Sequence, residues 1–330
     1  MRLLAVEVRR LFARRFFWIG GLALIIGIGV VLAITGAQSE VPDAADRARA
    51  ERMAAEQAPL VEQDRQRCQA AHDAQQRGEE DPSFGQYPPG YSCDEIRVPP
   101  AEDFLINDPF RFTSEMQDRT QVLTVVLALF AFLVGATAIG AEWHHGTLAA
   151  LLLWEPRRIR VFLAKLLALF GGMVVLAVAG YAVNVAGHWA VAQARGVVGN
   201  VTLDFQRELA LTTARGLAAT LVAAAVGFAL AFTLRRTAAA LGVLIAYFGV
   251  FEIGARAFFA EKAEPFLLSR YVEAWLSKRA EIFSYDCGPF GDCSNQQIVL
   301  TLWQGAAYLG GLGLLAVVVA ALVFRRREVA

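Results

Sequence analysis

The sequence predicts an all-α, polytopic membrane protein with six transmembrane helices and both termini in the cytoplasm. A small disulfide-containing external domain is expected between the first and second helices. Three observations predict this class: an apolar composition, long hydrophobic runs and the placement of arginines. Of the 330 residues, 56% are hydrophobic, and the mean hydropathy is +0.43, which is well above the apolar share of a typical soluble domain.

Six hydrophobic runs are each long enough to cross a bilayer. A hydrocarbon core about 30 Å thick needs roughly 20 apolar residues per helix. Backbone groups inside lipid must hydrogen-bond within the chain, so these runs should be helices. The runs are Phe16–Thr35, Thr120–Gly140, Val161–Val185, Leu211–Leu234, Ala238–Phe258 and Ile298–Phe324.

Arginines cluster beside alternate ends of these runs and set the expected topology. The positive-inside rule places such clusters in the cytoplasm, so both termini are expected there, and residues 298–330 end in a basic cytoplasmic segment. The opposite side receives residues 36–119, which are rich in acids, and residues 259–297. The clusters are Arg9, Arg10, Arg14 and Arg15; Arg157, Arg158 and Arg160; Arg235 and Arg236; and Arg325, Arg326 and Arg327.

Residues 1–15 are amphipathic at helical spacing. Apolar residues share one face and arginines occupy much of the rest. This predicts an interfacial helix on the inner membrane surface, with its arginines near anionic headgroups. The alternative, an ordinary positive flank that sets the topology, stays open. The apolar face consists of Leu4, Val8, Leu11 and Phe12.

Residues 36–119 are too long for a simple linker and predict the external domain. Pro42–Gln76 is rich in helix-forming residues, so we expect either one helix or a helical hairpin there. The proline-rich remainder is expected to be irregular. Three roles stay open for this domain: a lid over an exit, a docking site, or a decoration of the fold.

Residues 259–297 form the second expected external segment. Apolar residues recur in it at helical spacing, which predicts a re-entrant or interfacial helix with its aromatic rings at headgroup level. Spans four and five are joined by a very short turn near Leu234–Thr237 and should form an antiparallel hairpin. The apolar residues of the interfacial helix are Leu267, Leu268, Tyr271, Val272 and Trp275.

All four cysteines fall in predicted external segments. An even, exclusively external set is typical of an oxidising compartment and predicts disulfides. Loop locality favours the pairs Cys68–Cys93 and Cys287–Cys293, each of which would stabilise its loop by roughly 2–4 kcal/mol. A zinc site that uses His72 is the alternative, but its ligand spacing is poor. No resident metal is therefore predicted.

A short cytoplasmic segment at about residues 142–156 joins the second and third spans. Glu142 lies at the membrane boundary, where arginine is the usual residue. Gly146-Thr147 offers a flexible start for a short helix, and Pro156 ends it because proline lacks a backbone donor and clashes with the preceding turn. Such a helix can fit a groove on a soluble domain and pass movement to the attached spans; an amphipathic loop helix without a partner is the alternative. Its apolar face consists of Leu148, Leu151 and Leu152.

This segment resembles the cytoplasmic coupling region of ATP-binding-cassette transporter permeases of the type-two exporter class. In that family an acid precedes a Gly-Thr step, a leucine-rich turn, a proline followed by arginine, and a lysine in the next span. His144 and His145 stand where the family usually has an aromatic residue or arginine, and they are interpreted as interface residues. The six-span layout is also similar. The matching positions are Glu142, Gly146, Thr147, Leu148 to Leu153, Pro156, Arg157, Arg158 and Lys165.

The resemblance implies a permease subunit that is not itself an enzyme and that acts in a bacterial plasma membrane. ATP and Mg²⁺ would bind a separate ATPase subunit, in two copies, and a second permease copy would complete a homodimer or heterodimer. No G-x-x-x-x-G-K-[ST] phosphate loop occurs in the sequence. The implied substrates are drugs, antibiotics, peptides or lipid-like molecules moved outward. The partners are thus the ATPase, the second permease and the bilayer, without nucleic acid.

Besides Lys165, three charged residues fall within the predicted spans, where charge is costly and marks a functional candidate. Glu252 and Arg256 are one helical turn apart and can pair on one face, and Arg215 lies early in the fourth span. A structural pair and a polar path for substrate both stay open.

Two other function classes stay open beside the exporter. One is a membrane sensor or assembly scaffold with a ligand-binding external domain and no transport. The other is an intramembrane enzyme, but the spans contain no serine–lysine, aspartate-pair or H-E-x-x-H arrangement, which such chemistry requires.

Overall fold

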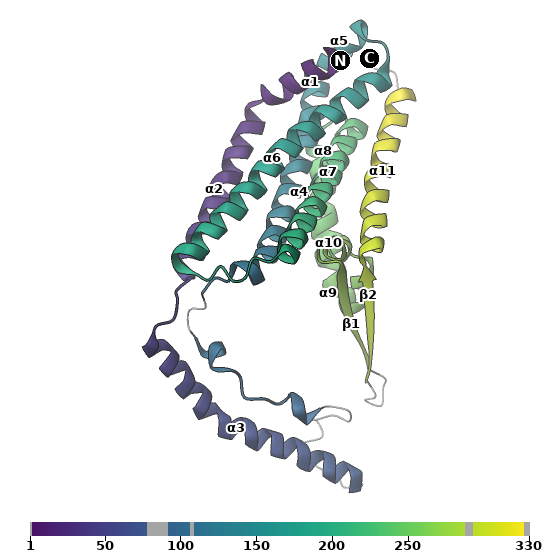
Figure 1. Cartoon of the computed structure of the whole chain (residues 1–330). Coiled ribbons are helices and arrows are strands. Elements are labelled where there is room, and N and C mark those ends of the chain that lie inside the picture. The colour runs from purple at the N-terminus through teal and green to yellow at the C-terminus, as the bar shows by residue number, and fades with distance from the viewer. Residues whose placement is uncertain (1, 78–91, 106–108, 288–292, 327–330) are drawn as a thin grey trace. The chain divides into compact units, whose positions relative to one another are not determined.

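The computed structural model describes residues 2–77, 92–105, 109–287 and 293–326, and is mostly helical (Figure 1). The chain divides into two compact units. Unit 1 consists of Met1–Val31, Thr113–His188 and Asn200–Ala330, and unit 2 consists of Leu32–Phe112 and Trp189–Gly199.

Among the residues that the structure describes, six helices are long and apolar enough to cross a membrane, as the hydrophobic runs predicted. The fifth is composite: helix α8 (Thr237–Ala246) continues through a π-helical segment, η4 (Tyr247–Gly254), into α9 (Ala255–Phe259). The other five are α2 (Arg15–Gln38), α4 (Phe112–His144), α6 (Arg158–Arg195), α7 (Leu203–Leu234) and α11 (Leu302–Arg326).

The shorter helices of unit 1 lie at both ends of this bundle. Helix α1 (Arg2–Phe12) covers the amphipathic N-terminal segment, and α5 (Thr147–Trp154) lies between α4 and α6. The 3₁₀ segment η5 (Ala260–Phe266) and helix α10 (Leu268–Ser277) follow α9. Figure 1 shows α1, α5 and the end of α11 at the same end of the bundle.

A β-hairpin corrects the all-α expectation. Strands β1 (Arg279–Cys287) and β2 (Cys293–Thr301) pair antiparallel, with Arg279 opposite Thr301 and Cys287 opposite Cys293. The last span therefore begins at Leu302 and not at Ile298. The hairpin forms because alternate residues bury one face of it against α10, as expected of a half-buried strand pair. The buried residues of this small cluster are Ala274, Ala280, Ile282 and Leu300, with Tyr271 packed against them.

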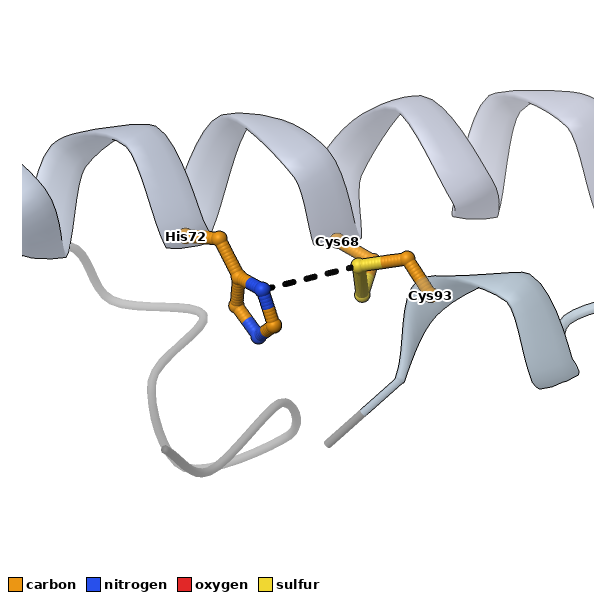
Figure 2. Close-up of side chains that lie close together, drawn as sticks. All are labelled: Cys68, His72 and Cys93. Carbon is orange, nitrogen blue, oxygen red and sulfur yellow. Dashed lines mark hydrogen bonds between the residues drawn. A yellow bond between two sulfur atoms is a disulfide. The ribbon is translucent and has the colours of Figure 1, made fainter. Parts of the chain in front are cut away.

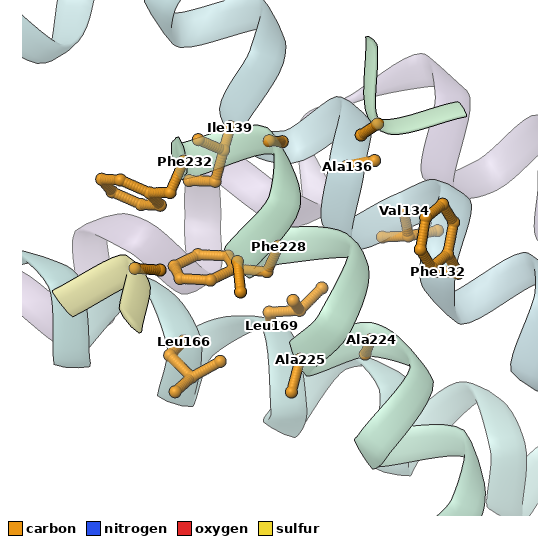
Figure 3. Packing of buried hydrophobic residues seen from close by; sticks show 14 of the residues in the cluster. Phe132, Val134, Ala136, Ile139, Leu166, Leu169, Ala224, Ala225, Phe228 and Phe232 are labelled. Carbon is orange, nitrogen blue, oxygen red and sulfur yellow. The ribbon is translucent and has the colours of Figure 1, made fainter. Parts of the chain in front are cut away.

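The core of unit 1 is an aromatic cluster between α6, α7 and α11. Phe228 and Phe232 of α7 contact Phe162 of α6 at ring-centroid distances of 5.2 and 5.0 Å, and Phe324 of α11 lies 4.9 Å from Phe232. All four side chains are buried. Figure 3 shows Phe228 and Phe232 among the aliphatic side chains of the same cluster, including Leu169.

Helices α4 and α7 approach closely because each has a glycine that lies against the backbone of the other helix. A Cβ atom on Gly227 would lie 2.2 Å from the carbonyl oxygen of Phe132, and one on Gly135 would lie 2.4 Å from that of Ala224. Both obstacles are backbone atoms, which cannot move without separating the helices. Small residues at such contacts are a common device in membrane bundles.

Gly227→Ala is therefore expected to destabilise the protein by about 1–3 kcal/mol, the usual cost of overpacking a core. Gly171→Ala is the matched control: it also lies in a long helix, α6, but its added Cβ meets nothing within 4 Å. Because alanine has the higher helix propensity, this control should keep or slightly raise the unfolding temperature in detergent. Equal unfolding temperatures for the two variants would contradict the close contact.

Unit 2 is built on helix α3 (Ala44–Arg77), which is a single helix and not a hairpin. Two short 3₁₀ segments, η2 (Cys93–Glu95) and η3 (Ala101–Phe104), pack beside it. The disulfide Cys68–Cys93 joins α3 to η2, as loop locality predicted. The irregular stretch expected at Pro82 to Gly90 lies outside the described residues.

Candidate functional site

A cluster of charged side chains lies where α1, α4 and α6 meet, next to α5. The Nζ atom of Lys165 lies 2.8 Å from Oε2 of Glu7 and 2.7 Å from Oε2 of Glu142. Arg14, in the turn after α1, donates from Nη2 to Oε1 of Glu142 at 3.0 Å. Arg10 pairs with the second oxygen of Glu7 at 3.2 Å. We call Glu7, Arg14, Glu142 and Lys165 the charge cluster.

The charge cluster is buried and internally balanced. The side chains of Lys165, Glu7 and Glu142 are only 3%, 5% and 11% exposed. The negative charge of its two carboxylates equals the positive charge of its ammonium and guanidinium together. Removing one partner from such a group leaves an uncompensated buried charge, which is far more costly than losing a surface ion pair.

The spacing of residues along α1 and α6 places these side chains among buried residues. On α1, Glu7 and Leu11 are four residues apart and share the face that turns to the bundle, where both are buried. On α6, Lys165 lies between the buried residues Phe162 and Leu169. A cavity of about 20 Å³ adjoins the charge cluster. That volume has room for water but not for a drug-sized ligand. The contacts of the charge cluster connect α1, α4 and α6.

Helix α5 has the start and end that the sequence predicted. Gly146 adopts a left-handed conformation (φ 66°) immediately before it, which glycine does without strain. The helix ends at Trp154, two residues before Pro156. The hydroxyl of Thr147 donates to the carbonyl of Glu142 at 3.4 Å.

The apolar surface that α5 exposes differs from the expected one. Leu148 is 1% exposed, and Leu151 and Leu152 pack against the core cluster of unit 1. The chain's own core covers this leucine face, so the face is not an exposed surface of the single chain. The exposed apolar residues are instead Leu153 and Trp154, at 86% and 89%.

The other predicted interface residues surround α5. His144 and His145 are exposed, with ring centroids 5.1 Å apart. Pro156 and Arg157 are exposed as well, whereas Arg158 is half-buried and donates to the carbonyl of Phe324 at 3.2 Å. Glu142 is not a surface residue, because the charge cluster holds it inside.

Sequence reasoning missed the parts that Glu7 and Arg14 play. Arg14 was assigned only to a topology-setting cluster, and Glu7 was not singled out. A signal was available for Glu7, because it is the one acid among the first fifteen residues of a basic segment. An acid on the apolar side of a basic amphipathic helix needs a buried cation, and Lys165 supplies it.

The intramembrane polar residues hold the two ends of α10. Glu252, buried in η4, accepts hydrogen bonds from the backbone N–H and the hydroxyl of Ser269 at 3.0 and 2.9 Å. Arg256 pairs with Glu252 at 3.9 Å, at the predicted one-turn spacing. Arg215 of α7 donates from Nη1 to the carbonyl of Leu276 at 2.8 Å.

This arrangement places an acid at the first turn of α10 and a cation at its last turn, which is the favourable pairing with the helix dipole. The indole N–H of Trp275 donates back to the carbonyl of Arg215 at 2.9 Å. Of the two interpretations of Glu252, Arg256 and Arg215, a structural role therefore has the contacts in its favour.

The second predicted disulfide pair lies in the hairpin. The register makes Cys287 and Cys293 partners across β1 and β2. Their side chains lie outside the described part of the chain, so this pair stays a prediction.

Comparison with known proteins identifies the family. A family model described as ABC-2 family transporter protein matches residues 1–329. No curated protein and no solved structure matches the chain. Since the match covers nearly the whole chain, and its six apolar helices and its short helix α5 agree with the resemblance drawn from residues 142–165, the chain belongs to the ABC-2 family of transporter membrane proteins.

Proposed function

We propose that the chain is the permease subunit of an ATP-driven exporter and that α5 docks a separate ATPase subunit. One observation carries the proposal: Leu153 and Trp154 are almost fully exposed on a short helix whose opposite face is anchored in the core. Exposed apolar surface outside the spans is typical of interaction sites. Family membership supplies the class of partner.

The charge cluster is the means by which movement of α5 reaches the bundle. Helix α5 lies between α4 and α6 in the chain, and the Glu142–Lys165 pair joins those two helices at 2.7 Å. Glu7 adds α1 to the same group. A push on α5 then moves these helices together as one body, which is the usual form of such transitions.

The full assembly in this proposal has two permease and two ATPase copies, with ATP and Mg²⁺ bound by the ATPases. Both termini and α5 lie on the cytoplasmic side of a bacterial plasma membrane. The arginines beside α1, α5 and the end of α11 support that orientation through the positive-inside rule. The substrate is a drug, antibiotic, peptide or lipid-like molecule moved outward.

Trp154→Ala is expected to weaken binding of the ATPase subunit by about 2 kcal/mol or more, because exposed tryptophans are frequent interface hot spots. That loss corresponds to roughly a thirtyfold rise in Kd. The measurement is copurification, followed by titration of the purified permease with its ATPase subunit. Transport in vesicles should fall as binding of the ATPase subunit weakens.

Trp303→Ala is the matched control, since Trp303 is 78% exposed but lies at the start of α11. It should leave ATPase binding unchanged. If Trp154→Ala binds the ATPase subunit normally and a folded Leu148→Ala variant does not, the docking face is formed by the leucines. Normal binding in all three variants would overturn the docking role of α5.

A further inference from the structure

Three metal-ligating side chains lie together in unit 2. Cys68 and His72 are four residues apart on α3 and share one face of the helix, and Cys93 lies opposite in η2. Their ligand atoms are all within 4.8 Å of one another. The Nδ1 atom of His72 lies 3.9 Å from Sγ of Cys93. Figure 2 shows the imidazole directed toward the Cys68–Cys93 disulfide.

The three side chains are partly enclosed: Cys68 is buried, and His72 and Cys93 are half-buried. Cys68 and the neighbouring Ala71 are fully buried, and Cys93 and Ile96 pack against them. The Nε2 atom of His72 is also buried, and it has no hydrogen-bond partner among the residues that the structure describes. Within that part of the chain, no strong hydrogen bond competes for the imidazole.

We propose that Cys68, His72 and Cys93 form a redox-gated zinc site. In the oxidised state the two sulfurs are joined to each other; after reduction they bind one Zn²⁺ together with His72. Two thiolates and an imidazole are ligands that zinc prefers, and a fourth position stays open for water. The spacing that seemed poor along the sequence is adequate in space.

The distances fit this exchange. Tetrahedral zinc, with bonds of about 2.3 Å to sulfur and about 2.0–2.1 Å to nitrogen, places two sulfurs about 3.8 Å apart and sulfur and nitrogen about 3.6 Å apart. The His72–Cys93 distance of 3.9 Å needs only a small adjustment. The Cα atoms of the two cysteines are 5.8 Å apart, so side-chain rotation can separate the sulfurs once their bond is broken.

The chemical steps balance with a dithiol as reductant. The dithiol gives two electrons and two protons to the Cys68–Cys93 bond, which becomes two thiols, and is itself oxidised to a disulfide. Zinc then displaces one proton from each thiol and accepts a lone pair from neutral His72. A metal link between α3 and η2 thus replaces the covalent one. In the reverse step a disulfide oxidant takes two electrons from the thiolates and two protons from water, is reduced to a dithiol, and leaves the Cys68–Cys93 bond re-formed and the Zn²⁺ released.

The test uses the full-length protein in detergent. The protein is reduced with a phosphine, exchanged into buffer without reductant under nitrogen, and titrated with ZnCl₂ against a chromogenic chelator. The reduced protein is expected to bind one zinc per chain and the oxidised protein less than a tenth of that. A reduced protein that takes up no zinc overturns the proposal.

Two variants assign the ligands. His72→Ala keeps the disulfide, and is expected to lower the zinc affinity of the reduced protein at least tenfold. The matched control, Cys287→Ser with Cys293→Ser, removes the other cysteine pair and should keep full zinc binding. Unchanged affinity in His72→Ala, or loss of zinc in the control, overturns the assignment. Neither result depends on transport, so the outcome is separate from that of the permease proposal.

Discussion

Lys165→Met is expected to destabilise the protein by about 3–5 kcal/mol, the cost of removing one partner from a buried ion pair. Methionine fills a similar volume, so the loss would come from charge and not from a cavity. Lys165 bridges two carboxylates at 2.7 and 2.8 Å, and its removal leaves Glu7 and Glu142 to share Arg14 and Arg10. The measurement is the unfolding midpoint in a mild denaturing detergent.

Lys278→Met is the matched control for charge removal. Lys278 also pairs with a glutamate, Glu208, at 2.6 Å, but its side chain is 49% exposed. Solvent screens such a pair, so this variant should lose only a small fraction of the stability that Lys165→Met loses. Similar losses in the two variants would contradict the importance of burial in the charge cluster.

A double variant separates unpaired charge from lost contact. Glu7→Gln combined with Lys165→Met leaves Glu142 paired with Arg14 at 3.0 Å, and no buried carboxylate of the charge cluster is then without a cation. The double variant should be more stable than Lys165→Met alone, with a coupling energy in the range of about 0.5–3 kcal/mol seen for contacting residues. A double variant less stable than the single one would show that hydrogen bonding, and not charge balance, dominates.

The membrane spans could be predicted from the sequence because they depend on local composition. A helix inside lipid satisfies its own backbone, so a run such as Leu211–Leu234 indicates a span whatever its neighbours are. The hairpin at residues 279–301, in contrast, depends on contacts with another part of the chain. A two-stranded hairpin is marginal alone, and this one depends on the contact of Ile282 and Leu300 with α10, which no local pattern encodes.

The candidate site also has features that local sequence predicts and features that depend on distant contacts. The helical period of Leu148, Leu151 and Leu152 was recognised correctly, but periodicity identifies a buried face without saying what buries it. The chain's own core covers this face, and Leu153 and Trp154 are left outside. The partnership of Glu7 with Lys165 spans 158 positions, a separation at which a single sequence carries almost no pairing signal.

Arg215→Met is expected to destabilise α10 more than any other part of the protein, with a loss of about 2–4 kcal/mol. The guanidinium donates to the carbonyls of Leu276 and Trp275 at 2.8 and 3.4 Å. These carbonyls lie at the last turn of α10, where the helix itself offers no donor. Hydrogen bonds from a charged group contribute about 1.5–3 kcal/mol, and buried acceptors left without a partner add to the loss.

Hydrogen exchange distinguishes this local effect from general unfolding. Amides of α10 and of the hairpin packed on it should exchange faster in Arg215→Met. Those of α6 should keep their protection, because the described hydrogen bonds of the Arg215 side chain go to α7 and α10. Arg215→Lys should restore part of the protection, since an ammonium keeps the charge but lacks the fixed planar geometry with which Nε and Nη2 bond Leu211 and Thr212 while Nη1 reaches the carbonyls of α10.

Arg256→Met is the matched control, because Arg256 also contacts α10, through the hydroxyl of Ser269 at 2.8 Å, but is 46% exposed. Its removal should cost less than about 1 kcal/mol and leave α10 protected, since Glu252 still accepts from the backbone of Ser269. Equal exchange of α10 in the Arg215 and Arg256 variants would mean that the C-terminal carbonyls do not need the buried guanidinium. A uniform loss of protection across unit 1 would instead make Arg215 part of the global core, and α10 would not be a separately held element.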